Sequence, residues 1–435
     1  MSLGGGTFES QNKILPGTYI NFVNLSRATK SLSERGYLGV PLDFLKWGDN
    51  GVITIKAQDF EKNALKITGY AYDTEENKPF REMFKHAHTI YGYNMHKDSA
   101  KASNAYGTAV KGGTRGNDLK TVITINVDDN TKYDVVTYLG TEIVDSQTVG
   151  LASELVACDF VIPKTSATLA ETSGTPYENG TDGTITAQSH QDALDILESY
   201  NFNVLICPTI EDTIKTLYKN YVSRLRDEKG IKFQVVLYNK RVDYEGCINV
   251  KNKAKGTGND YKLIYWTGGA EAGCAINKSC SNMTYDGEYE IDTDYTQAEL
   301  EEAMTNGELV FHRMGNEIRI LEDINSLTTL TEKKGEDFKY NQTIRVIDQI
   351  AMEVATTFNN DFYGKMPNDV DGRISLRDKI VDIHKALVRV RALETFDEKG
   401  LEVQEGENKR SVVIPTYKIN VINCMSQLYM TVQVA

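Results

Sequence analysis

The sequence predicts a multidomain chain of mixed α+β and α/β class, with β-rich domains in the N-terminal half and an α/β core in the C-terminal half. Three observations lead to this prediction. The 435 residues exceed the roughly 250–300 residues at which a single hydrophobic core stops growing. Strand-like runs dominate before residue 163, and helices alternate with strands after residue 188. Both chain ends resemble uncharged strands.

We expect the chain to divide into five stretches, which are domains or terminal arms. The clearest boundary is a linker at residues 163–188, because Thr, Ser, Gly and Pro dominate it and large apolar side chains are nearly absent. In chain order the stretches are an N-terminal extended arm (1–25), a small β-rich domain (26–90), a second β-rich domain (91–187) that ends in the linker, an α/β core (188–412) and a C-terminal strand arm (413–435).

The N-terminal arm has no charged residue from Ile14 to Leu25, and Pro16-Gly17 introduces a short extended run. A proline before an uncharged β-prone segment is typical of an edge strand or an added strand. The residues expected to form this strand include Thr18, Tyr19, Ile20 and Phe22.

Local patterns predict the elements of the β-rich half. Pro79 fits the first turn of a helix over 79–87, where its missing amide hydrogen is no loss. Asp128-Asp129-Asn130 separates two β-prone runs and predicts a hairpin. The expected strands are 52–57, 65–70, 121–127, 132–139 and 155–162, and residues 91–120 are expected to form a loop.

After the linker, the β-α-β order predicts a partly parallel sheet covered by helices. Gly315-Asn316 fits a two-residue hairpin turn between strands at 308–314 and 317–323. Three polar pairs have the spacing of a helix N-terminus: Ser189 with Asp192, Thr209 with Asp212, and Thr296 with Glu299. The other expected strands are 203–207, 232–238 and 246–250, and residues 263–278 are expected to be helical.

Two amphipathic helices are predicted near the C-terminus. The first has an apolar stripe at spacings of three and four from Ile344 to Phe358. The second is expected to begin at a capping box formed by Ser375 and Asp378. Its predicted apolar face consists of Leu376, Ile380, Ile383, Leu387 and Val390.

The chain ends in a strand-like stretch without a charged side chain from residue 421 to residue 435. From Gln427 onward, polar and apolar residues alternate strictly. The apolar row is Leu428, Met430, Val432 and Val434. Because a chain end is usually frayed and polar, we expect this one to be paired with another strand.

The composition excludes several classes of partner. The net charge of −13 argues against nucleic acid, whose binding depends on cationic contacts to phosphate. No apolar run approaches the ~18 residues of a membrane helix, so we expect no stable membrane insertion. The six cysteines are scattered and no signal peptide precedes them, which favours folding in a reducing cytosol.

We predict no catalytic, cofactor-binding or metal site. The loop at 255–260 lacks the further glycines and the Lys-Ser/Thr pair of a phosphate cradle, and is interpreted as a turn. The histidines at positions 86, 88 and 96 lack the spacing of metal ligands. The alternating acidic residues of 286–294 lack the offsets of a calcium loop.

Cysteine and nucleophile patterns do not indicate an enzyme either. Cys274 and Cys280 are six residues apart and have no second pair, so they match neither a zinc ribbon nor a redox motif. No candidate nucleophile lies in a strained Gly-x-Ser-x-Gly turn.

The second C-terminal helix carries a cluster of basic residues in an otherwise acidic protein. The cluster consists of Arg373, Arg377, Lys379, Lys385, Arg389 and Arg391. A solvated helix face and a docking face for an acidic partner are both compatible with this pattern.

Five stretches of sequence resemble contractile phage tail sheath proteins, in the branch found in prophages and phage-like particles of Gram-positive bacteria. In the C-terminal half they are 322–329, 341–348 and 362–365 followed by Asn368. At the two ends they are 5–8 with 16–19, and 418–434. The resemblance is strongest from about residue 203 onward and weak over 26–187.

This resemblance implies a structural protein without cofactors. Such subunits polymerise in stacked helical layers around the inner tail tube, and contraction drives the tube through the host envelope. The resemblance implies partners in further copies of the chain, a tail tube protein, a baseplate and a tail terminator. It also implies that terminal arms add strands to neighbouring subunits and that the C-terminal domain faces the tube, which makes the basic helix a candidate for the tube contact. It further implies that the protein is assembled in the host cytoplasm and resides in the virion.

Two alternatives stay open at this point. The chain could be another tail component, associated with the baseplate or the tube. It could also be an α/β enzyme whose site has no recognisable motif.

Overall fold

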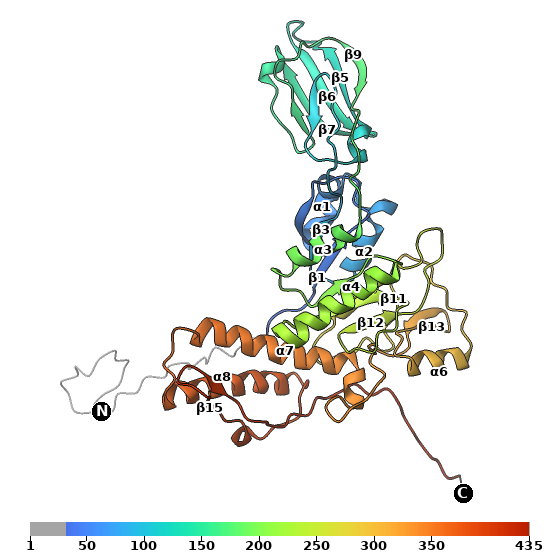
Figure 1. Ribbon diagram of the computed structural model, residues 1–435. Coiled ribbons are helices and arrows are strands. Elements are labelled where there is room, and N and C mark those ends of the chain that lie inside the picture. Colours follow the sequence, from blue (N-terminus) through green and yellow to red (C-terminus); the bar gives the residue numbers. More distant parts are fainter. Residues whose placement is uncertain (1–31, 435) are drawn as a thin grey trace, which may run out of the picture.

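The computed structural model describes residues 32–434 and has three parts arranged along one direction (Figure 1). A β-rich domain lies at one end, a six-stranded sheet with helices on both faces lies in the middle, and a pair of long helices lies at the other end. The strand expected at Thr18, Tyr19, Ile20 and Phe22 lies outside the described residues. Among residues 32–434, no helix combines the length and the hydropathy that crossing a membrane would need.

The central sheet has the order β12-β11-β10-β1-β3-β2, and only the edge strand β2 is antiparallel to its neighbour. Its strands are β1 (Tyr37–Leu42), β2 (Gly51–Lys56), β3 (Thr89–Asn94), β10 (Val204–Ile206), β11 (Gln234–Tyr238) and β12 (Cys247–Val250). Strands from the expected 26–90 domain and from the expected 188–412 core therefore share one sheet. Local sequence patterns cannot predict this pairing, because it joins residues far apart in the chain, such as Leu38 and Val204.

Helices cover both faces of this sheet, as the β-α-β order predicts. On one face lie α1 (Ala57–Thr68), α2 (Lys78–Phe84) and the almost fully buried α5 (Leu263–Gly273). On the other face lie α3 (Ala187–Leu197) and α4 (Asp212–Ser223). Gly269 allows α2 and α5 to approach closely, since a Cβ there would be 2.5 Å from the Met83 carbonyl oxygen.

The β-rich domain is inserted between β3 and α3. Its main sheet has the order β7-β6-β5-β9, and the short strands β4 (Gly107–Ala109) and β8 (Val161–Pro163) pair beside it. The four strands are β5 (Leu119–Ile125), β6 (Tyr133–Leu139), β7 (Glu142–Val149) and β9 (Thr172–Pro176). The segments that enter and leave the domain pair with each other through the bridges Lys97–Thr184 and Ala100–Thr181.

Several predicted elements in this half differ from the structure. The hairpin over 121–139 is confirmed, but the stretch 163–188 contains β9, because its threonines are good strand formers. Residues 91–120, expected as loop, contain β4 and the beginnings and ends of other strands. Only the end of 155–162 belongs to a strand.

The predicted strand at 65–70 is wrong, because most of this segment lies in α1. The buried residues Phe60, Ala64 and Thr68 have a spacing of four, which is helical. Gly69, with φ of 79°, ends the helix in the left-handed conformation that favours glycine.

The C-terminal half contains α6 (Gln297–Thr305), the hairpin β13 (Phe311–Met314) and β14 (Glu317–Ile320), α7 (Asn341–Thr357), α8 (Val370–Arg389), and the small pair β15 (Gln404–Glu405) and β16 (Val412–Val413). The capping box of Thr296 with Glu299 and the turn at Gly315-Asn316 are confirmed.

Ser375 and Asp378 do not begin α8. Asp369 does, because its side chain accepts a hydrogen bond from the Gly372 amide at 2.8 Å. Val390 is 38% exposed and lies outside the buried face of α8.

Candidate functional site

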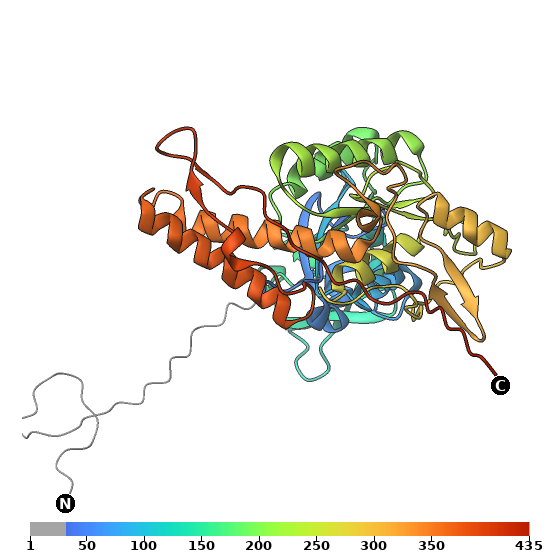
Figure 2. The ribbon, with the colours of Figure 1, turned by 90° about the horizontal axis from the view of Figure 1, so that it is seen from below.

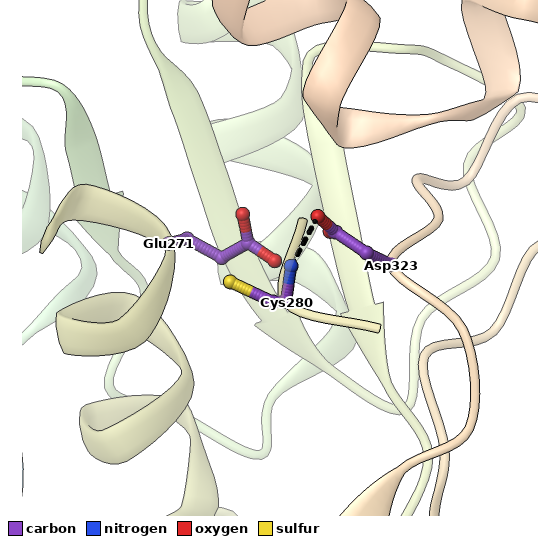
Figure 3. Close-up of side chains that lie close together, drawn as sticks. All are labelled: Glu271, Cys280 and Asp323. Carbon is purple, nitrogen blue, oxygen red and sulfur yellow. Dashed lines mark hydrogen bonds between the residues drawn. The ribbon is translucent and has the colours of Figure 1, made fainter. Parts of the chain in front are cut away.

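A buried cluster of charges lies where α7 meets the central sheet. Arg345 of α7 donates to Glu271 Oε2 of α5 at 2.7 Å and to Asp323 Oδ2, three residues after β14, at 3.2 Å. All three side chains are 1% exposed. Figure 3 shows Glu271 and Asp323 pointing toward the same space from two segments of the chain. We call this set the Arg345 cluster.

The pKa values of the two carboxyl groups in the Arg345 cluster are shifted in opposite directions. Burial alone would raise the pKa of Asp323, but Arg345, the Cys280 amide at 2.9 Å and Asn341 Nδ2 at 2.8 Å donate to it, and its pKa lies below the usual range. Burial and the neighbouring Asp323 hold the pKa of Glu271 well above its usual range. Asp323 is therefore the stronger acid of the two, whereas Glu271 keeps its proton to a higher pH than an ordinary glutamate does.

Glu271, Asp323 and Cys280 also have the chemical types of a metal-ligand set. Their carboxylate and thiol ligand atoms lie within 4.8 Å of one another. However, the Arg345 guanidinium already contacts both carboxylates and supplies the positive charge that a metal would provide. We therefore assign the cluster a structural role: it fastens α7 to α5 and to the segment after β14.

A second buried ion pair fastens α7 one helical turn later. Arg226 lies in the π-helical continuation of α4, and its two terminal nitrogens donate to the two oxygens of Asp348 at 2.6 Å and 2.8 Å. Asn341, at the start of α7, accepts from Gln234 Nε2 of β11 at 2.9 Å. The stretches 322–329 and 341–348 thus form a structural junction between α7 and the sheet.

The apolar row of the C-terminal strand-like stretch lies exposed on the surface. Residues 422–434 form no strand ladder with any described residue, and Leu428, Met430, Val432 and Val434 are between 68% and 93% exposed. The root of this segment is held by Gln342, whose side chain donates to the Ile422 carbonyl at 3.0 Å and accepts from the Cys424 amide at 2.9 Å. The C-terminal end of the chain runs away from the body (Figure 1), and residues 425–434 are exposed. We call residues 425–434 the C-terminal extension.

A surface suited to receive such an extension lies at the other end of α7. Figure 2 shows β15 near the end of α7 that is opposite to the departing C-terminus. Within residues 32–434, β15 and β16 pair only with each other, so each has an open edge. Beside β16 lies a mainly apolar groove of about 630 Å³, here called the α7 groove. It is lined by residues that include Val354, Phe358, Leu376, Ile380, Val412 and Tyr417.

The predicted basic residues do not form one uniform face of α8. Arg377 donates to the Leu401 and Glu398 carbonyls, and Arg373 donates to Asn368, so both are engaged within the subunit. Lys385 pairs with Glu398 at 2.9 Å. Lys379, Arg389 and Arg391 are exposed and make no ion pair with the residues that the structure describes. Asp378 and Asp382 are exposed on the same helix.

The other motifs of interest do not converge on a site. The 255–260 loop is a turn in which Gly256 and Gly258 have positive φ, and Lys255 pairs with Glu290. The three histidines have separate partners: His86 contacts Asp286, His88 contacts Thr89, and His96 contacts the Gly183 and Asp43 carbonyls. The sequence analysis missed the Arg345 cluster, and the only local signal was the arginine inside the stretch 341–348.

Three family models match consecutive parts of the chain. They are the phage tail sheath protein beta-sandwich domain over 96–182, the phage tail sheath protein central domain over 183–326, and the phage tail sheath C-terminal domain over 333–435. The first covers the inserted β-rich domain, and the last covers α7, α8 and the C-terminal extension.

Similar proteins come from bacteria and their prophages. The phage-like element PBSX protein XkdK of Bacillus subtilis is 33% identical over an alignment of 378 residues, which covers 80% of this chain and 80% of that one. The structure of the sheath tail protein of Desulfitobacterium hafniense has 35% identity and a TM-score of 0.78, and covers 89% of this chain and 93% of that one. The sheath tail protein of Listeria innocua has 29% identity and a TM-score of 0.75, and covers 91% and 94%.

Proposed function

The chain belongs to the phage tail sheath protein family, and on that premise we propose that its C-terminal extension links neighbouring subunits by adding a strand to the next copy. The protein is a structural subunit of the contractile tail of a phage or phage-like particle, and it is not an enzyme. The proposal concerns how its subunits are joined.

The proposal is based on the distance within one subunit between the C-terminal extension and the strands β15 and β16, which could accept it. The extension leaves at the start of α7, whereas β15 and β16 lie near the other end of this 17-residue helix. At 1.5 Å per residue, the helix separates them by about 25 Å. Because the extension also points away from the body, the open edges of β15 and β16 are available to a second copy.

Physical chemistry favours such a link. An exposed, uncharged strand with one apolar face is prone to aggregate unless it is paired. Each new backbone hydrogen bond to the acceptor edge would contribute about 1 kcal/mol net, and burial of the apolar row would add to that. The alternating row would place Leu428, Met430 and Val432 over the α7 groove while polar residues face outward. The N-terminal arm, with its run at 18–22, is proposed as a second link of the same kind.

We propose further that the assembled sheath surrounds a tail tube and docks to it through exposed cations of α8 and of the residues just after it. Lys379, Arg389 and Arg391 are the members of the predicted basic set that remain available. A contact of this type is sensitive to salt, so it could hold the tube without being permanent. Contacts with a baseplate and a tail terminator, assembly in the host cytoplasm and residence in the virion belong to the same proposal.

The test is removal of residues 425–435, which leaves the root at Gln342 intact. We expect the full chain at high concentration to form striated hollow tubes or rings in negative-stain electron micrographs. The truncated chain is expected to keep its circular dichroism spectrum and remain a monomer. Tubes formed by the truncated chain would refute the link, and loss of folded structure would place the extension in the subunit's own core.

A further inference from the structure

A fully buried histidine contacts two residues that line the α7 groove. His384 of α8 is 0% exposed. Its Nδ1 lies 2.8 Å from the Ile380 carbonyl oxygen, and its Nε2 lies 3.0 Å from the Tyr417 hydroxyl. Ile380 and Tyr417 both line the α7 groove. The imidazole therefore joins α8 to the segment that follows β16, at the surface proposed to receive a strand.

The two contacts determine the tautomer of the His384 ring. A carbonyl oxygen can only accept a hydrogen bond, so Nδ1 carries the hydrogen and the neutral ring accepts from the Tyr417 hydroxyl through Nε2. A proton added to Nε2 would remove this acceptor and place a positive charge in a site that excludes water. In agreement with this, burial lowers the pKa of His384 from its ordinary value.

The surroundings of the ring do not compensate such a charge. The ring centroids of Phe396 and Tyr417 lie 5.0 Å and 5.5 Å from that of His384. Among residues 32–434, no carboxylate oxygen lies within ion-pair distance of His384. Charged side chains on the elements around it are exposed or have other partners: Arg345, Asp348 and Glu353 of α7, Arg377, Asp382 and Lys385 of α8, Glu394, Asp397, Glu398 and Lys399 after α8, and Lys418 beside Tyr417.

Residues 415–419, here called the Tyr417 segment, have few polar contacts with the rest of the subunit. Within residues 32–434, their backbone makes no hydrogen bond with other backbone groups, and the contact of Tyr417 with His384 is their one side-chain hydrogen bond. Tyr417 also packs on the apolar cluster that contains Ile380. The chain is fixed again at Asn420 and Ile422, which bond to the backbone of residues 392–394. Loss of the His384 contact therefore acts on a segment that is anchored only at its ends and by packing.

We propose that His384 is an acid-sensitive switch for the α7 groove. When Nε2 takes a proton, the Tyr417 segment leaves α8, and the groove loses one of the walls over which the extension of the next copy would lie. This inference rests on the proposed link between copies and adds its regulation: assembly weakens in acid and recovers at neutral pH.

The direction of the effect follows from proton binding. When the segment is open, the ring titrates near the ordinary histidine pKa of about 6.5, whereas the closed form resists the proton. Above about pH 6.5 the closed form keeps its full stability relative to the open form, and this stability is lost as the pH falls. At about pH 5 an ordinary histidine is protonated by about thirty to one, so opening is favoured by up to about thirtyfold.

Hydrogen exchange followed by mass spectrometry tests the switch in the full-length chain, kept below the concentration at which it assembles. Protection factors at about pH 5 and about pH 7.5 are compared, because they divide out the intrinsic pH dependence of exchange. We expect peptides covering 412–419 to lose protection by up to about thirtyfold at the lower pH, and peptides of α5 to keep theirs. His384→Gln has no titrating group and should show no such loss. His88→Gln, at an exposed position, should behave like the natural chain.

Two results of the exchange experiment would overturn the switch. They are equal protection of 412–419 at both pH values in the natural chain, and a loss of protection in acid that His384→Gln retains. Circular dichroism checks the fold of each variant. If His384→Gln does not fold, Tyr417→Phe takes its place. This change removes the hydroxyl that bonds to Nε2, so it should lower the protection of 412–419 already at neutral pH, and unchanged protection would contradict the proposal.

Assembly is the second readout, and light scattering measures the concentration that it needs. We expect this concentration to rise from about pH 7.5 to about pH 5 for the natural chain and to stay nearly constant for His384→Gln. An opening of 412–419 that leaves the assembly concentration unchanged would overturn the regulatory role of His384. Failure of the proposed link is a separate result, because it appears as tubes formed by the chain that lacks residues 425–435.

Discussion

Arg226 and Asp348 form a two-point hydrogen-bonded ion pair that joins the end of α4 to the middle of α7, with distances of 2.6 Å and 2.8 Å. Arg226 also donates to the Phe233 carbonyl at 2.7 Å, so the guanidinium is enclosed on both sides. Among the described residues, Asp348 is the only one whose carboxylate lies within ion-pair distance of the Arg226 guanidinium. Separating this pair would leave a buried charge uncompensated, and the first prediction concerns that cost.

We expect Asp348→Asn to lower the free energy of unfolding by about 3–5 kcal/mol, because it leaves the Arg226 charge buried without its partner. Urea denaturation measures this change. Asp382→Asn on the exposed face of α8 is the matched control and should change stability by less than about 0.5 kcal/mol. Equal effects of the two changes would mean that the pair contributes nothing to the junction.

The second prediction concerns the protonation of Glu271. In the unfolded chain this carboxyl ionises near its ordinary pKa of about 4.3, but in the folded protein its pKa is raised well above that value. Above about pH 4.3 the folded state therefore binds more protons than the unfolded state, and the stability contributed by Glu271 falls as the pH rises. Glu271→Gln cannot ionise and should remove this loss.

Urea denaturation at about pH 5 and about pH 8 tests this sign. The stability of Glu271→Gln relative to the natural chain should increase between the two pH values. Glu301→Gln, at an exposed position on α6, should show no such trend. A Glu271→Gln chain that is strongly destabilised at both pH values would mean that Glu271 is ionised in the folded protein.

The third prediction tests the alternation of the C-terminal extension. Leu428→Ser combined with Val432→Ser removes two apolar side chains from the same face, each of which stabilises a buried contact by about 1.5–3 kcal/mol. Every 1.4 kcal/mol is a factor of ten, so the concentration needed for assembly should rise by at least about a hundredfold. Light scattering and sedimentation measure that concentration.

Gln427→Ser combined with Gln433→Ser provides the control, because it changes the opposite face and keeps the alternation. We expect assembly of this variant at nearly the natural concentration. If both double variants were equally impaired, the extension would be recognised by its length or backbone alone.

The fourth prediction concerns the exposed cations at the end of α8 and just after it. Arg389→Glu combined with Arg391→Glu should leave the fold unchanged and reduce co-sedimentation with the tail tube, most strongly at low salt. Lys132→Glu, on the distant β-rich domain, is a control with the same charge change per residue. Unchanged co-sedimentation of the double variant would exclude this part of α8 as the docking surface. Arg377→Glu is unsuitable for this test, because Arg377 holds two backbone carbonyls and its loss would destabilise the subunit.

The sequence correctly predicted features that are determined by residues close to one another in the chain. The capping box at Thr296, the turn at Gly315-Asn316 and the apolar stripe of α7 are local patterns with one geometric solution. The start of α8 was wrong by six residues because Asp369 competes with Ser375 as a cap, and sequence spacing does not decide between them. The threonines of 163–188 resembled a linker, although strand pairing with β5 gives that segment its structure.

The sheet order and the Arg345 cluster could not be predicted in this way. Arg345 and Glu271 are 74 positions apart, and each reads as an ordinary polar residue within its own helix. The apolar stripe from Ile344 to Phe358 predicts the helix, but only Ile344 of that stripe is fully buried, and the stripe does not show that a buried arginine will find a carboxylate there. Likewise, β1 is a central strand because it pairs with β3 on one side and β10 on the other, and these two strands come from different parts of the chain.

The inserted β-rich domain has a consequence for diversification. Because the chain enters and leaves it along two segments that pair side by side, at Lys97–Thr184 and Ala100–Thr181, a change of length between them leaves the spacing of β3 and α3 unaltered. The tip of the β5–β6 hairpin, where Val127 is 96% exposed, lies at the end of the molecule farthest from α7 and α8. That tip can therefore display a foreign peptide while the packing of the central sheet is preserved.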